Sequence, residues 1–275
     1  MKVSCIIPVK NRKNMVGKAV SSVLAQDYSN LEVIVVDDGS IDGTPETLRR
    51  NFPEMNILQA GGRGAGYARN AGVKASSAEI VMFLDSDDIW LRGHVTRLVE
   101  ALDRGFQVAY GITVNEDVVS GEKFLIPAPD QGREGDCYYD LLRWCYMVPS
   151  TVAVRRQAFE DSGGFEELPP GAIGEDWLFF LELAGKHEFG FAGIGPLTRR
   201  VLHAGSLCRN IDQDMLHGLI GKIRNKVMGK PDQDQKNLRE CLARFDKMEK
   251  LISYKGRKWN CVQQWYNGLK KEALV

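Results

Sequence analysis

The sequence predicts an α/β fold, with a Rossmann-like, mostly parallel sheet flanked by helices and a helical extension at the C-terminus. Apolar runs typical of buried strands alternate with segments of helical spacing over the first 85 residues, which is the order of a parallel sheet. Two of these runs end in aspartates, Asp37-Asp38 and Asp85-Ser86-Asp87-Asp88. Because open α/β sheets bind ligands at the carboxyl ends of their strands, these acids should line one edge together.

The elements of the first half follow from local patterns. Strands are expected at 3–9, 31–36, 56–58 and 79–85. Helices are expected at 14–26, 44–51 and 67–75. The first helix is predicted by Val16, Ala19, Val20, Val23 and Leu24, which recur at helical spacing.

The pattern is looser in the second half. We expect helices at 91–102, 155–160 and 174–183, and strands at 107–114, 150–154 and 197–202. Residues 115–136 read as a loop-rich connection with one hairpin strand at 123–126. We therefore predict a catalytic domain over 1–205, made of halves 1–105 and 106–205, and a helical extension over 206–275.

Composition excludes several classes of protein. The 275 residues contain 36 basic and 36 acidic side chains, so no overall positive field favours nucleic acid. The six cysteines form no C-x-x-C pair, and neither a signal peptide nor an apolar run of membrane-spanning length is found. The expectation is a cytoplasmic protein with free thiols.

The acidic run at 85–88 is the strongest chemical signal. Buried carboxylates need a positive partner, and a divalent cation at a strand end is a natural one. In an extended chain Asp85 and Asp87 point the same way, so both could face one metal or a metal-bound phosphate. The alternative is a solvated turn in which an aspartate caps the helix that starts near Leu91.

Other candidate residues have two interpretations each. Arg69 is either a surface arginine of its helix or a donor that reaches a base or phosphate. Glu175 and Asp176 either complement a helix dipole or provide a general base. His203, near Arg199 and Arg200, is either structural or a ligand. The glycines at 61–66 do not fit a dinucleotide fingerprint, because they follow the third strand and the final glycine is missing.

Six segments together resemble the family 2 inverting glycosyltransferases with the GT-A fold, over roughly residues 1–205. They are Val3 to Asn11, Val35 to Ser40, Ala68 to Gly72, Phe83 to Asp88, Gly163 to Phe165, and Glu175-Asp176. The resemblance implies a nucleotide-diphosphate sugar donor, with UDP favoured, and Mn or Mg held by the Asp-x-Asp motif. It also implies transfer of a hexosyl or N-acetylhexosaminyl group to a glycan or lipid-linked acceptor, in polysaccharide or glycolipid synthesis.

The resemblance also assigns roles by position. Pro8 and Asp38, with Asp37 beside them and Arg69 nearby, resemble the residues that hold the nucleobase. Asp85 resembles the contact to ribose and sugar, Asp87 the metal ligand, Asp176 the catalytic base, and His203 a further ligand of metal or diphosphate. The remaining expected substrate contacts are Val9, Asn11, Ser86, Glu175 and Arg200. Lys10 departs from the family, which often has an aromatic residue before Asn11.

Two other functions compete with this one. A sugar-phosphate nucleotidyltransferase would carry a glycine-rich basic loop after the first strand, where this chain has Pro8 to Arg12 without glycine. A non-catalytic nucleotide-sugar-binding module would not need Asp85, Asp87 and Asp176 together.

The C-terminal segment is basic. Residues 215–275 carry fourteen Lys and Arg against six Asp and Glu, and residues 254–274 mix basic side chains with Trp and Tyr. This pattern suits peripheral contact with the inner face of a membrane. The alternative is that the aromatic residues pack on the catalytic domain or on a second subunit of a homodimer.

Overall fold

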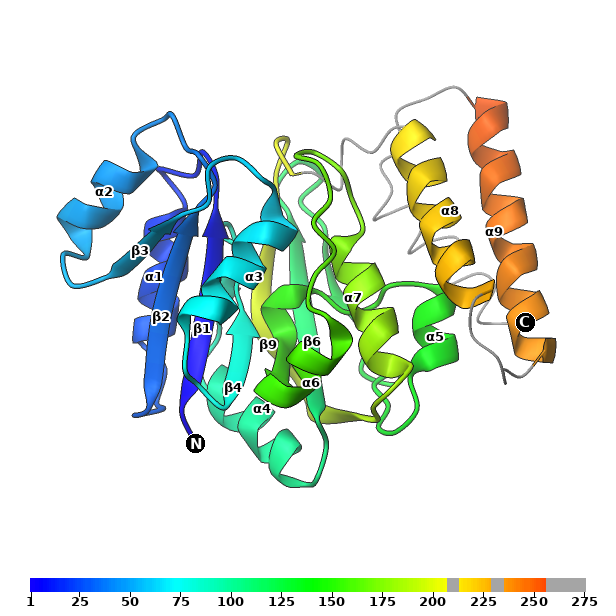
Figure 1. Ribbon diagram of the computed structural model, residues 1–275, viewed down its shortest axis with the longest axis horizontal. Coiled ribbons are helices and arrows are strands. Elements are labelled where there is room, and N and C mark those ends of the chain that lie inside the picture. The colour runs from blue at the N-terminus through cyan, green and yellow to red at the C-terminus, as the bar shows by residue number, and fades with distance from the viewer. Residues whose placement is uncertain (207–212, 229–234, 256–275) are drawn as a thin grey trace. The chain divides into compact units, whose positions relative to one another are not determined.

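The computed structural model describes residues 1–206, 213–228 and 235–255 (Figure 1). The chain contains two compact units. The first comprises Met1–Pro170 and Glu175–Val201, and the second comprises Gly171–Gly174 and Leu202–Val275. The predicted halves 1–105 and 106–205 stay a prediction.

The first four strands of the first unit form the parallel part of a mixed sheet, in the order β3-β2-β1-β4. They are β1 Val3–Val9, β2 Leu31–Asp37, β3 Asn56–Gln59 and β4 Ile80–Phe83. The connecting helices are α1 Val16–Leu24, α2 Thr44–Asn51 and α3 Ala65–Ala75. This is the alternation predicted from the apolar runs, and β1 is buried along all seven of its residues.

The remaining strands continue the sheet in the antiparallel sense. They are β5 Ile89–Trp90, β6 Val108–Asp117, β7 Lys123–Ile126, β8 Val152–Arg155 and β9 Phe189–Leu202. Strand β8 pairs antiparallel with both β4 and β6, so the sheet runs β3-β2-β1-β4-β8-β6-β9-β5, with β7 beside β6. The predicted α/β fold class is confirmed, with the parallel pairing confined to β1–β4.

Several elements of this half are longer than predicted. Strand β6 continues to Asp117 because Thr113, Asn115 and Asp117 are buried although they are polar. Strand β9 begins at Phe189, eight residues before the predicted start, since Gly190, Gly193, Gly195 and Pro196 hide the strand pattern there. Strand β5 and two short helices, α5 Tyr138–Arg143 and η1 Pro149–Thr151, were not predicted from the sequence.

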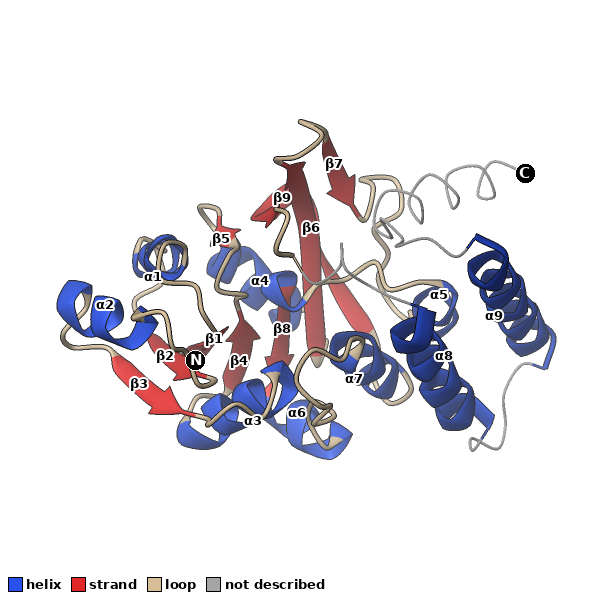
Figure 2. Ribbon diagram, turned by 90° about the horizontal axis from the view of Figure 1, so that it is seen from above, coloured by secondary structure: helices blue, strands red, loops and turns tan. Residues whose placement is uncertain are grey.

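Helices cover both faces of the sheet (Figure 2). Helices α1, α2 and α4 His94–Asp103 share one apolar core with alternate residues of β1, such as Cys5 and Ile7. Helices α3, α6 Arg156–Ser162 and α7 Glu175–Ala184 lie on the other face. There Gly72 of α3 lets the helix approach β1 closely, because a Cβ at this position would lie 2.3 Å from Ile6 Cγ2.

Among its described residues, the second unit contains the helices α8 Gln213–Met228 and α9 Gln235–Lys255. Both helices lie within the segment 206–275, for which the sequence predicted a helical extension. Buried side chains include Leu216, Leu219, Ile220, Ile223, Val227, Leu238, Cys241 and Phe245. Among the described helices, none is long and apolar enough to cross a membrane. The aromatic and basic segment beyond residue 255 lies outside the described residues.

Candidate active site

The acidic run after β4 forms a turn. The backbone N–H of Asp88 donates to Asp85 O at 2.9 Å, and this bond closes the turn. The expectation that Asp85 and Asp87 point the same way assumed an extended chain, and that assumption was wrong. The two side chains have different arginine partners, since Asp85 pairs with Arg69 and Asp87 with Arg12.

Asp88 is the buried member of the turn. The hydroxyl of Ser150 donates to Asp88 Oδ2 at 2.6 Å and accepts from the Asp85 backbone N–H at 3.1 Å. Burial raises the pKa of Asp88, the negative charge of Asp85 raises it further, and the positive charge of Arg200 opposes this. The N-cap of α4 is Gly93, so the alternative that an aspartate of this run caps the following helix was wrong.

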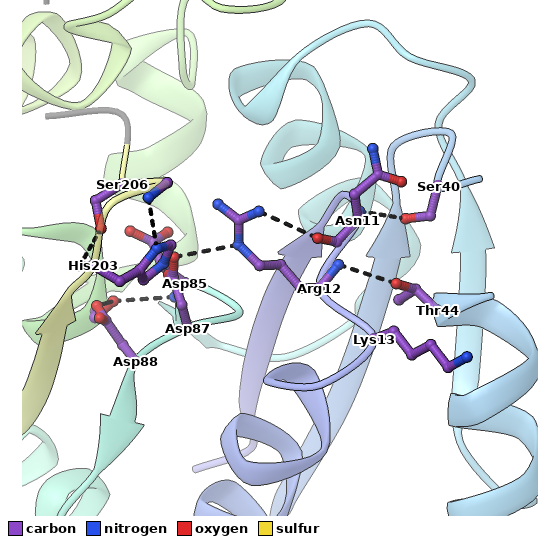
Figure 3. Close-up of polar contacts among 12 residues, drawn as sticks. Asn11, Arg12, Lys13, Ser40, Thr44, Asp85, Asp87, Asp88, His203 and Ser206 are labelled. Carbon is purple, nitrogen blue, oxygen red and sulfur yellow. Dashed lines mark hydrogen bonds and ion pairs between the residues drawn. The ribbon is translucent and has the colours of Figure 1, made fainter. Parts of the chain in front are cut away.

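Arg12 joins the loop after β1 to this turn (Figure 3). Its Nε lies 3.4 Å from Asp87 Oδ2, and its backbone N–H donates to Thr44 Oγ1. Asn11 precedes it with a φ of 52°, and Asn11 is held by bonds to Ser40 Oγ and from the Ile41 N–H. Arg12 was not among the predicted site residues, although its place beside Asn11 after a strand was a usable signal.

The aspartates after β2 organise the next loop. Asp38 is buried, and its carboxylate accepts from the backbone N–H groups of Arg63 and Gly64 at 2.7 and 3.0 Å. Lys10 Nζ lies 3.5 Å from the same carboxylate. Asp37 Oδ2 accepts from the Ser40 N–H, while its buried Oδ1 has no hydrogen-bond partner among the described residues. The hydrogen bonds from these two backbone N–H groups to Asp38 therefore hold the glycine-rich stretch at 61–66 in place.

Arg69 is buried, so the surface interpretation of this arginine was wrong. Its Nη2 donates to Asp85 Oδ1 at 2.7 Å and its Nη1 donates to Glu175 Oε1 at 2.9 Å. The guanidinium also lies over the ring of Phe165, 5.0 Å from its centroid. The two carboxylates hold the pKa of Arg69 above its ordinary value despite burial, so it remains a cation.

Asp176 lies in the first turn of α7, next to Glu175. Burial and the charge of Glu175 raise the pKa of Asp176 to about 6, whereas the charge of Arg69 lowers it. One carboxylate oxygen, Oδ1, accepts from the Trp177 N–H at 2.7 Å. A half-buried carboxyl with this pKa can accept a proton near neutral pH, which is the property of a general base.

Residues 4–163 match the family model described as glycosyl transferase family 2, which is more than half of the chain. The chain belongs to this family. Its fold is that of the GT-A glycosyltransferases. The structure of *Staphylococcus aureus* TarS 1–349 in complex with UDP-GlcNAc has a TM-score of 0.75 at 19% identity, covering 96% of this chain and 78% of that one.

Relatives of this family 2 glycosyltransferase include two *Escherichia coli* proteins with assigned reactions. Both are named UDP-Glc:alpha-D-GlcNAc-diphosphoundecaprenol beta-1,3-glucosyltransferase. WfgD is 32% identical over 56% of this chain and 60% of its own length, and WfaP is 29% identical over 78% and 82%. An uncharacterized glycosyltransferase of Nostoc is 35% identical over 58% of this chain. The matched region spans only 52% of the length of that relative.

The structure brings some predicted site residues of this glycosyltransferase together. Asp85, Arg69 and Glu175 form one chain of ion pairs, and Asp176 lies beside them. Pro8 and Val9 are buried in β1, and Val9 O accepts from the Asp38 N–H. Their roles toward substrate stay predictions.

Three further predicted residues have contacts outside this chain of ion pairs. Ser86 is buried in the acidic turn, and Arg200 of β9 acts electrostatically on Asp88. His203 belongs to the second unit, where its Nδ1 accepts from the Gly205 N–H at 3.1 Å and its backbone N–H donates to Ser206 Oγ. A neutral His203 in this arrangement carries its proton on Nε2, so metal binding through Nε2 would require the Gly205 bond to break.

Sequence reasoning missed Ser150 as well as Arg12. Ser150 is fully buried, and its carbonyl accepts from Trp90 Nε1 and Thr198 Oγ1 in addition to the hydroxyl contacts with the acidic turn. No pattern in the sequence links a serine of the short helix η1 to an acid 62 positions earlier.

Proposed function

We propose that this chain is an inverting glycosyltransferase that moves a sugar from a nucleotide-diphosphate sugar, with UDP favoured, to an acceptor hydroxyl. The observation that carries the proposal is the place of Asp176. A carboxyl with a pKa of about 6 lies beside the acidic turn of a family 2 sheet. The UDP-GlcNAc complex of TarS and the UDP-Glc named for WfgD and WfaP support a uridine donor.

We propose separate roles for the residues of the chain. Asp176 would take the proton of the acceptor hydroxyl as that oxygen attacks the anomeric carbon, from the face opposite the leaving diphosphate. Asp38, Asp37, Pro8, Val9 and Asn11 would bind the nucleobase side of the donor. Asp85 and Ser86 would bind the ribose and sugar, with Arg200 nearby.

A divalent metal fits the acidic turn if it arrives with the donor. Burial raises the pKa of Asp88, and the negative charges of Asp85 and Asp87 raise it further against the opposing charge of Arg200. A cation beside these three carboxylates would be attracted to them. Within the described part of the chain, no group of three His, Cys, Asp or Glu residues could hold a metal. Mg²⁺ is commonly held by one or two carboxylates and substrate phosphates, so Asp87 would hold the ion together with the diphosphate of the donor, and Asp85 could add a second carboxylate. A bound Mn or Mg would neutralise charge on the leaving diphosphate.

The acceptor we propose is a lipid-linked glycan, in polysaccharide or glycolipid synthesis. WfgD and WfaP are named for diphosphoundecaprenol acceptors, which reside in membranes. The basic C-terminal region would hold the enzyme at the inner, anionic face of the membrane. If it does, the full chain should sediment with anionic liposomes at low salt, whereas a chain ending at Ser253 should stay in solution. Equal sedimentation of both would exclude the tail as an anchor and favour the alternative, in which its aromatic residues pack on the catalytic domain or on a second subunit.

A panel of nucleotide sugars tests the function. We expect the wild-type chain to release a nucleoside diphosphate from one of them, faster with Mn than after chelation. Thermal shifts across the same panel should be largest for that donor, because a ligand that binds only the folded state stabilises it. Release of pyrophosphate would favour a nucleotidyltransferase, and binding without turnover would favour a non-catalytic module.

A further inference from the structure

We propose that Arg69 is a positioning residue, which holds the first turn of α7 against the acidic turn after β4. The inference rests on the proposed function and gives Arg69 a task other than donor contact. Asp85 and Glu175 lie 90 positions apart in the sequence, and a single guanidinium bridges them. Both bonds are charge-assisted, and they fix direction as well as distance.

The burial of this bridge argues against a donor contact. The side chain of Arg69 is 5% exposed, and the carboxylates of Asp85 and Glu175 occupy both of its terminal nitrogens. The Nε of Arg69 has no hydrogen-bond partner among the described residues, but it is buried, so a donor group could reach the guanidinium only through the small part of its surface that is exposed. A donor group that took the place of either carboxylate would leave a buried charge without its partner, which is unfavourable.

The guanidinium itself is held by a second set of contacts. Asn70 clamps the backbone of Phe165, because its Nδ2 donates to Phe165 O at 2.8 Å and its Oδ1 accepts from the Phe165 N–H at 2.9 Å. The Phe165 ring lies under Arg69 and stacks on Phe179 of α7 with centroids 4.1 Å apart. The segments 68–72, 163–165 and 175–176 therefore form one connected structure.

Gly164 shows how closely these segments pack. Its φ is 73°, and a Cβ there would lie 2.8 Å from Asn70 Oδ1. Only glycine suits this backbone and this distance. The Asn70 clamp, and with it the ring under Arg69, thus depends on the glycine pair that precedes Phe165.

The consequence for the reaction concerns Asp176. Asp176 follows Glu175 on the same helical turn, so a shift of Glu175 moves the proposed base relative to the acidic turn. A displacement of about 1 Å can cost on the order of 10²-fold in rate. Arg69 also acts on Asp176 through its charge, which opposes the effect of Glu175 and Asp85 on the same carboxyl.

Arg69→Lys is the variant that tests the proposal, because a lysine keeps the charge but cannot bridge two carboxylates with a planar fork. We expect kcat to fall roughly 10- to 100-fold, while the calorimetric Kd for UDP changes less than about threefold. Hydrogen exchange of the amides in the first turn of α7 should become faster. The matched control is Arg104→Lys, an exposed arginine paired with Glu134, which should change none of the three quantities.

Glu175→Gln removes the charge from one arm of the bridge, so that only a weaker, neutral hydrogen bond can form there, and it provides a second variant if Arg69→Lys folds poorly. The double variant should lose little more turnover than either single one, because both break the same link. The proposal is overturned if Arg69→Lys keeps its kcat, if its loss is confined to UDP affinity, or if exchange in α7 is unchanged. A wild-type chain that releases no nucleoside diphosphate contradicts the proposed function instead, and the exchange measurement then decides the positioning role alone.

Discussion

At the scale of single residues, two adjacent carboxyls have different environments. Glu175 is ion-paired with Arg69, whereas Asp176 has a hydrogen bond from the Trp177 N–H and a pKa raised to about 6. A carboxyl whose pKa is raised by burial and by a neighbouring negative charge is a common acid or base in catalysis. This contrast is the reason to choose Asp176 over Glu175 as the base.

The pH profile should follow from that pKa. A base must be deprotonated, so we expect kcat to fall as the pH drops below about 6, where Asp176 becomes protonated. The charge of Glu175 raises this pKa, so Glu175→Gln should move the midpoint of the acidic limb to a lower pH. Initial rates between pH 4.5 and 8 measure it, with buffers of constant ionic strength. A midpoint that moves to higher pH, or stays in place, would contradict the assignment.

Substitution of Asp87 tests whether this residue binds the metal. Its carboxylate is 20% exposed and has a partly exposed partner in Arg12, so a cation can reach it without unfolding the turn. Asp87→Asn should abolish the gain in UDP affinity that Mn provides to the wild type, as measured by calorimetry with and without Mn. Asp103→Asn, an exposed aspartate on α4, is the control and should keep that gain. If Asp87→Asn binds UDP and Mn as tightly as the wild type, Asp87 is not a metal ligand.

At the scale of elements, the close contact between α3 and β1 places Arg69. Gly72 lies one turn of α3 after Arg69, and a Cβ there would meet Ile6 Cγ2 at 2.3 Å and Val36 Cγ2 at 3.1 Å. Gly72→Ala should therefore destabilise the fold by about 1–3 kcal/mol, the usual cost of overpacking. Gly17→Ala in α1 is the control, because its nearest atom is 3.9 Å away, and it should be neutral or stabilise by up to about 1 kcal/mol. Urea unfolding measures both, and equal stability of the two variants would contradict this packing.

The sequence predicts elements well where their signals are local. Strands β1 to β4 and helix α1 have apolar runs or helical spacing that can be counted in short windows, and the structure has them close to the predicted positions. Strand β9 could not be recognised over its first half, because glycines and a proline weaken the pattern while pairing across the sheet supplies the stability. The segment 85–88 was expected to be extended, but a backbone hydrogen bond between Asp88 and Asp85 makes it a turn. The side-chain types in this segment do not reveal that bond.

At the scale of the whole molecule, the candidate site is made of contacts between distant segments. The acids were predicted from the motif positions. Asp37-Asp38 follow β2 and Asp85 follows β4, and both of these strands pair in parallel with β1, which lies between them in the sheet. The partners of these acids could not be predicted, because Arg69 and Glu175 are 106 positions apart and Ser150 and Asp88 are 62 apart. Burial of Arg69 in particular follows from the packing of α3, the loop at 163–165 and α7.

The turnover of Asp176→Asn, with a saturating nucleotide sugar, tests the central claim most directly. Asparagine has nearly the same shape but cannot accept the proton, so nucleoside diphosphate release should slow by about 10²- to 10⁴-fold, the scale of general base catalysis. The Kd for UDP should stay close to that of the wild type, because the nucleotide is proposed to bind elsewhere on the sheet edge. Turnover close to that of the wild type, or a loss that appears only in UDP affinity, would contradict the claim that Asp176 is the base.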